Sequence, residues 1–170
     1  HHWNQALLLQ VRHPLDPTTL HQALRALITH HDALRLRFVP TPNGWTQSFA
    51  DPNVDGELLL VFDLSQTPEA DLAPAIQAHA AEVQASLHLT HGPLLRAAYF
   101  PHPGRLLITI HHTAVDAVSW PILLQDLLTA YTQAAQQQPI SLPPKSSSFQ
   151  RWAQELQRYA QSEALHHELP

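Results

Sequence analysis

An apolar run that ends abruptly in two histidines constrains this 170-residue chain more than any other feature. Residues 106–110 read Leu-Leu-Ile-Thr-Ile, which is typical of a buried strand. His111 and His112 follow at once, Asp116 comes four residues later, and a segment of helical periodicity begins near Ser119. We therefore predict a strand, a loop that carries the histidines and Asp116, and then a helix. Catalytic side chains often lie on such loops, because the flanking elements hold them rigidly.

The two histidines suit acid–base chemistry. Histidine is the side chain whose ordinary pKa lies nearest neutrality, so it can take or give a proton without a large pKa shift. Neighbouring residues at a strand end point to opposite faces, so we expect one of His111 and His112 to face a cleft and the other to be packed. Asp116 could orient a histidine, or it could pair with a buried arginine and hold the loop. A purely structural histidine pair is the alternative reading, because buried histidines usually have hydrogen-bond partners.

A metal site built from His111, His112 and Asp116 is a further alternative that the pattern does not favour. The side chains of adjacent histidines diverge, and the sequence offers no obvious further ligand. Cysteine is absent, which excludes disulfides and thiolate zinc sites and is compatible with the reduced cytoplasm. We therefore expect no metal.

The remaining pattern predicts an α/β fold, in which helices flank a mixed sheet. The expected strands are residues 4–12, 34–38, 45–49, 58–62, 94–100 and 105–110, and the expected helices are residues 17–31, 67–87, 118–137 and 149–168. The first strand is apolar enough for burial on both faces. An Asn-Gly turn near residue 43 joins two strands as a hairpin, so a strictly alternating parallel fold is excluded.

Two arginines of the second expected strand leave two readings open. Arg35 and Arg37 alternate with apolar residues, as on the polar face of a half-buried strand. Such a face usually meets water. One arginine could instead turn inward to pair with Asp116, because a guanidinium stays charged and binds a carboxylate through two hydrogen bonds.

Charge and hydropathy argue against nucleic-acid and membrane partners. The chain has 9 Lys and Arg against 14 Asp and Glu, and its basic residues are scattered rather than clustered. It contains no apolar run of about 18 residues, the length of a membrane span. Its first residues do not read as a signal peptide, so we expect a cytoplasmic location. The length suits one domain with a real core.

The histidine motif also resembles a known family. Residues 111–120, HHTAVDAVSW, resemble the HHxxxDG motif of the condensation-domain superfamily of nonribosomal peptide synthetases. The continuation VSWPILLQDL is similar to the epimerisation branch. Further similar stretches follow in family order and, with the motif, cover nearly the whole chain: HWNQ at 2–5, HHDALRLRF at 30–38, HGPLLR at 91–96 and LPPKSSSF at 142–149. Ala117 departs from the family glycine, and Pro121 departs from the arginine usual in the epimerisation branch.

This resemblance implies an activity and a set of site residues. An epimerisation domain inverts the α-carbon of an aminoacyl or peptidyl thioester that a carrier domain holds on its 4′-phosphopantetheine, and it binds no cofactor of its own. His112 would move the α-proton or steady the enolate, and Arg35 would pair with Asp116. Ala117 and Ser119 would lie where the substrate arm approaches. A glycine at 117 could serve a positive φ or a close approach, so Ala117 is expected to strain or crowd the loop.

The resemblance further implies that residues 1–170 form one lobe, similar to chloramphenicol acetyltransferase, of a two-lobed domain. The family's partner glutamate belongs to the second lobe, so we expect the isolated chain to be inactive. Expected partners are that second lobe, a peptidyl carrier domain and neighbouring synthetase domains. Two alternatives remain. One is a condensation domain that forms peptide bonds, against which the Val118-Ser119-Trp120 and Pro143-Pro144-Lys145 stretches argue. The other is a catalytically silent docking module, for which Ala117 is the motive.

Overall fold

The computed structural model describes residues 3–52, 56–163 and 165. Its strands are β1 (Asn4–Gln10), β2 (Leu36–Thr41), β3 (Gly44–Phe49), β4 (Leu59–Val61), β5 (Leu95–Phe100) and β6 (Arg105–His111). Its helices are α1 (Pro17–His30), α2 (Glu69–Ala85), α3 (Ser119–Ala135) and α4 (Phe149–Tyr159), with a short 3₁₀ helix, η1 (Asp32–Arg35), after α1. None of the helices in these described ranges is both long and apolar enough to cross a bilayer.

The predicted order of elements is confirmed, with differences at element ends. One difference is in the kind of element: residues 34–35 belong to η1 rather than to a strand. The last helix ends at Tyr159, and the predicted extension to residue 168 lies partly outside the described residues. The same holds for part of the expected loop at 51–56 and for His2 of the HWNQ stretch.

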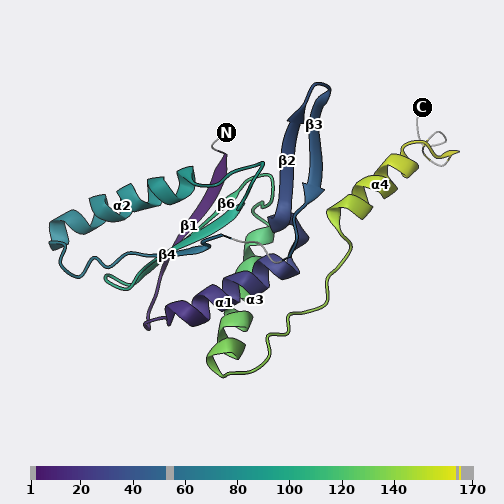
Figure 1. Ribbon diagram of the computed structural model, residues 1–170. Coiled ribbons are helices and arrows are strands. Elements are labelled where there is room, and N and C mark those ends of the chain that lie inside the picture. The colour runs from purple at the N-terminus through teal and green to yellow at the C-terminus, as the bar shows by residue number, and fades with distance from the viewer. Residues whose placement is uncertain (1–2, 53–55, 164, 166–170) are drawn as a thin grey trace.

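Four strands form one mixed sheet in the order β1-β6-β5-β4, and β2 pairs with β3 as a separate hairpin. β6 runs antiparallel to both β1 and β5, whereas β4 runs parallel to β5. Figure 1 shows α1 and α3 on one side of this sheet and α2 on the other. The predicted α/β sandwich with a mixed sheet is therefore confirmed.

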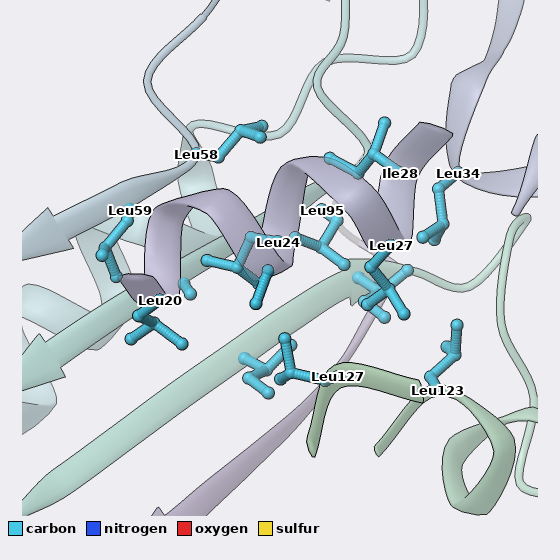
Figure 2. Packing of buried hydrophobic residues seen from close by; sticks show 14 of the residues in the cluster. Leu20, Leu24, Leu27, Ile28, Leu34, Leu58, Leu59, Leu95, Leu123 and Leu127 are labelled. Carbon is cyan, nitrogen blue, oxygen red and sulfur yellow. The ribbon is translucent and has the colours of Figure 1, made fainter. Parts of the chain in front are cut away.

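The larger core lies between α1, α3 and the sheet. α1 begins where the Asp16 carboxylate accepts a hydrogen bond from the Thr19 backbone N–H at 2.8 Å, with Pro17 in the first turn. Its leucines recur at helical spacing and meet leucines of α3 and the sheet, as Figure 2 shows for Leu24, Leu95 and Leu127. Each such burial stabilises the fold by about 1.5–3 kcal/mol. This packing places α3 on the same face of the sheet as α1, so the loop from β6 to α3 leads to that face.

A smaller core lies under α2, on the other face of the sheet. Leu72 and Val83 of α2 pack with Phe100 of β5 and Leu107 of β6. β1 is at the sheet edge, beyond this cover, and its Leu8 is 51% exposed. The prediction that β1 is buried on both faces is therefore wrong, because α2 covers β5 and β6 instead.

Helix α4 follows a long extended connector and stands apart from the sheet in Figure 1. Its apolar side is present as predicted, but none of its described residues is buried. Phe149, Trp152, Leu156 and Tyr159 are between 45% and 81% exposed. The helix therefore adds little to the core.

Candidate active site

His111 is the packed member of the histidine pair. Its backbone N–H donates to Leu94 O at 2.9 Å, and its Nδ1 lies 3.0 Å from Thr113 Oγ1. The residue is 4% exposed, and its Nε2 has no hydrogen-bond partner among the described residues. Burial lowers the pKa of His111, and the neighbouring His112 lowers it further. A buried neutral ring of this kind suits a packing role.

His112 is exposed and lies on the opposite side of the strand end. Its backbone N–H donates to Trp3 O at 2.7 Å, which ties the start of β1 to the loop. Its ring makes two hydrogen bonds, from Nδ1 to Val115 O at 2.8 Å and between Nε2 and Gln5 Nε2 at 3.2 Å. The structure thus separates the two histidines as the strand alternation predicts, with His111 buried and His112 exposed.

Gln5 and Trp120 complete this site, and the sequence pattern predicts neither as a site residue. The indole Nε1 of Trp120 donates to Gln5 Oε1 at 2.7 Å, while the ring itself packs in the core. Gln5 reaches His112 because β1 pairs with β6, with Gln5 opposite Ile110. In the sequence, Gln5 belongs to the HWNQ stretch, which was noted only for its resemblance to the family. Gln5 could not be placed beside His112 without knowledge that β1 pairs with β6.

Asp116 has a different role from either one predicted. Its Oδ1 accepts from the Ser119 backbone N–H at 2.8 Å and from Ser119 Oγ at 2.5 Å. These hydrogen bonds lower the pKa of the Asp116 carboxyl, the Ser119 hydroxyl contributing most. Asp116 therefore closes the turn just before α3, whose N-cap residue is Val118, and it gives the N–H of the first helical residue a partner. It shapes the loop and hydrogen-bonds neither histidine.

The predicted pairing of Arg35 with Asp116 is wrong in this structure. Arg35 donates through NH1 to Ile28 O and Thr29 O, both at 2.7 Å, and through NH2 to Asp32 at 2.7 Å. Residues 32–35 form η1 rather than a strand, which turns the guanidinium toward the last carbonyls of α1. Those carbonyls have no helical partner, so a cation is favourable there.

Arg37 also lies inside the protein, so the alternative that both arginines face water is wrong as well. Arg35 is 7% exposed and Arg37 is 8% exposed. The Arg37 guanidinium lies directly under Gly92, where a side chain would collide with it. Its NH1 donates to Leu36 O at 2.8 Å, and burial lowers its pKa. Gly92 also has a φ of +74°, a conformation that strains any residue with a side chain.

The two departures from the family pattern are accommodated without strain. In the described part of the chain, Gln137 is the non-glycine residue with positive φ, so Ala117 does not occupy the conformation that would need glycine. Ala117 is also exposed. Pro121 lies in the first turn of α3, where a missing N–H costs little. The expected strain at Ala117 is therefore absent.

An open cavity of about 750 Å³ lies where the end of α1 and the β2–β3 hairpin face α3, the connector and α4. At its wall, His31 Nε2 lies 2.8 Å from Asp126 Oδ2, which joins α1 to α3. Burial lowers the pKa of His31, partly offset by Asp126. His30 adds a third possible metal ligand, and the three ligand atoms lie within 4.8 Å of one another. The direct His31–Asp126 hydrogen bond suits a structural contact between helices.

Comparison with known proteins places the chain in a family. The family model described as "Condensation domain" matches residues 1–169. The chain belongs to the condensation-domain family. It is 51% identical over 170 residues to one of the linear gramicidin synthase proteins of Brevibacillus parabrevis, covering 97% of this chain and 3% of that protein. It is 38% identical to tyrocidine synthase 1 of the same organism, covering 99% of this chain and 16% of that protein.

Solved structures of the condensation-domain family share the fold. The epimerization domain from the third module of tyrocidine synthetase B aligns with a TM-score of 0.90 at 37% identity, covering 99% of this chain and 38% of that one. The starter condensation domain of rhizomide synthetase aligns with a TM-score of 0.73 at 23% identity, covering 93% and 38%. The superfamily resemblance and the fold are therefore confirmed, and the chain spans well under half of these relatives.

Proposed function

We propose that this chain is the N-terminal lobe of an epimerisation domain in a nonribosomal peptide synthetase. It would convert the L to the D configuration at the α-carbon of an aminoacyl or peptidyl thioester on a carrier domain. The observation that carries the proposal is the exposed ring of His112, held by hydrogen bonds on both nitrogens at the end of β6. The higher identity and TM-score to an epimerization domain than to a starter condensation domain support it.

The chemistry needs a group that moves a proton at the α-carbon. The thioester acidifies that proton, and His112 Nε2 would accept it or return it. The enolate oxygen that forms must be stabilised by hydrogen-bond donors. Inversion also needs an acid–base group on the opposite face of the planar intermediate. We propose that the second lobe supplies that group, so residues 1–170 hold half of the site.

The substrate arm would approach the loop at Ala117, which is exposed beside the start of α3. Ser119 would act indirectly, because its hydroxyl is already bound to Asp116. The phosphopantetheine belongs to the substrate and its carrier domain, which would be the partners of this lobe together with the second lobe and neighbouring synthetase domains.

A condensation domain is the second candidate. The matching family model bears that name, and a starter condensation domain shares the fold. In that reaction His112 would position or deprotonate an attacking amine, and the product would be a peptide bond. The silent docking module was considered because Ala117 replaces the family glycine. Ala117 is exposed and does not adopt a positive φ, so this reason for a docking module no longer holds.

The test uses the intact synthetase that carries this lobe, with an L-aminoacyl thioester on its carrier domain in D₂O. Deuterium at the α-carbon and the ratio of D to L product are followed for the wild type and for His112→Ala. His102→Ala is the matched control, because His102 is also exposed and lies in the turn at the far end of β6. Epimerisation predicts exchange and inversion in the wild type, with an inversion that His112→Ala abolishes and His102→Ala retains.

Other outcomes would contradict the proposal. Thioester consumption by an added amine, without exchange at the α-carbon, would establish condensation instead. Inversion that survives His112→Ala would remove His112 from the mechanism, whereas exchange without inversion would come from the second acid–base group. Turnover by the isolated 170-residue chain would refute the claim that the second acid–base group lies outside it.

A further inference from the structure

Three hydrogen bonds in series run from Trp120 through Gln5 to His112 and on to Val115. An indole N–H can only donate, so the atom of Gln5 that lies 2.7 Å from it must be the amide oxygen. The amide nitrogen must then face His112. The orientation of the Gln5 amide is therefore fixed by chemistry, because Trp120 offers no acceptor to a flipped amide.

The same reasoning fixes the proton on His112. The Gln5 amide nitrogen can only donate, so His112 Nε2, 3.2 Å away, must accept and carries no proton. Val115 O can only accept, so Nδ1, 2.8 Å away, must carry the proton. We infer that Gln5 and Trp120 are positioning residues that hold neutral His112 in the tautomer with an unprotonated Nε2.

This inference rests on the proposed function, to which it gives a physical basis. A base must present a lone pair to the proton that it abstracts, and the opposite tautomer would present an N–H instead. His112 Nδ1 is turned inward to the loop carbonyl, so Nε2 is the nitrogen left for the substrate. The Gln5 amide lies 3.2 Å from Nε2. A substrate at Nε2 would take the place of this amide, while the hydrogen bonds from Trp120 to Gln5 and from Nδ1 to Val115 O persist.

Gln5→Glu is the decisive variant, because glutamate has the same shape. Its carboxylate can still accept from Trp120, but toward His112 it replaces a donor with an acceptor. Both ring nitrogens of His112 would then face acceptors, so the variant should add a proton at Nε2 while Nδ1 keeps its proton toward Val115 O. Gln10→Glu is the matched control, since Gln10 is exposed at the other end of the same strand. Trp120→Phe is a second variant, which keeps an aromatic ring in the core and frees the Gln5 amide to rotate.

The direct test is ¹⁵N NMR of the 170-residue chain labelled at histidine, with the His112 signals assigned through His112→Gln. The wild type and Gln10→Glu should show a protonated Nδ1 and an unprotonated Nε2. Gln5→Glu should show a protonated Nε2, and Trp120→Phe should show a mixture. A purely structural role for Gln5 would leave the tautomer unchanged. An unchanged tautomer in Gln5→Glu, or Nε2 protonated in the wild type, would overturn the inference.

The rate of inversion at the α-carbon in the intact synthetase gives the second readout. Gln5→Glu should lower this rate at least about a hundredfold and Trp120→Phe about tenfold, whereas Gln10→Glu should leave it unchanged. An unchanged rate in Gln5→Glu would contradict the positioning role. If inversion survives in His112→Ala, the proposed function of His112 fails, whereas the NMR result still decides the tautomer by itself.

Discussion

Replacement of Arg35 by methionine should make this chain much less stable, although the hydrogen-bond partners of Arg35 lie outside the proposed site. Methionine keeps an apolar stem in the same space and removes the guanidinium. The Ile28 and Thr29 carbonyls, each 2.7 Å from Arg35 NH1, would lose their charged donor at the end of α1. A buried carbonyl without a partner destabilises the folded state, because it has lost its hydrogen bonds to water and gained none within the protein.

The two hydrogen bonds set the magnitude. A hydrogen bond to a charged group contributes about 1.5–3 kcal/mol, so Arg35→Met should lower the free energy of unfolding by about 3–5 kcal/mol. The ion pair with Asp32 adds at most about 1 kcal/mol, because the Asp32 side chain is 37% exposed and its charge is screened.

The assay is urea unfolding of the 170-residue chain, followed by tryptophan fluorescence. Arg12→Met is the matched control at an exposed arginine, and it should change the free energy of unfolding by less than about 0.5 kcal/mol. Double-mutant cycles then identify the partner of Arg35. The cycle with Asp32→Asn should be non-additive, and the cycle with Asp116→Asn should be additive. Coupling to Asp116, or equal losses in Arg12→Met and Arg35→Met, would refute the reasoning.

Three further outcomes are expected. The pKa values of His31 and His111 are lowered from 6.5 in the folded chain, so the unfolded chain takes up protons first as the pH drops. The free energy of unfolding should therefore fall as the pH drops below 6.5. In urea titrations, His31→Gln and His111→Gln should each make the free energy of unfolding less dependent on pH. Thr109→Val should leave the melting temperature unchanged or raise it, because the buried Thr109 hydroxyl has no hydrogen-bond partner among the described residues; a fall of several degrees would reveal a missed partner. Ala117→Gly should lower the free energy of unfolding by about 0.5–1 kcal/mol, because glycine raises the conformational entropy of the unfolded chain. The exchange rate should stay unchanged, since Ala117 is unstrained. A large gain in rate would show that alanine crowds the substrate arm.

The fold could be predicted because the periodicity of the chain is local and strong. The Asp16-Pro17 start of α1 and the apolar run before His111 each identify an element without knowledge of its neighbours. Burial of whole faces was harder to predict. Leu8 lies in an apolar run but is half exposed, because its cover depends on which strands α2 reaches.

The site was predicted only where its residues are adjacent in sequence. His111 and His112 could be assigned opposite sides from strand alternation alone. Gln5 could not be found, because its contact with His112 joins residues 107 positions apart through the β1–β6 register. Arg35 was misplaced because one 3₁₀ turn, which alternation does not reveal, changes the direction of its side chain. Asp116 was expected to orient a histidine or to pair with an arginine. It instead hydrogen-bonds Ser119, three residues later, and forms the turn that leads into α3.

The edge position of β1 should make the geometry of the proposed site more sensitive to heating than the rest of the fold. In the described sheet β1 is hydrogen-bonded to β6 on one side. β1 supplies the Gln5 amide that holds the His112 ring, and Trp3, just before β1, supplies the carbonyl that holds the His112 backbone. Edge strands open locally at a lower free energy than the whole fold. Each such opening would release His112 while the core of α1, α3, β5 and β6 stays intact. Turnover by the intact synthetase should therefore decline on heating before this chain unfolds globally, and the half-life of activity should follow hydrogen exchange in β1 rather than global unfolding.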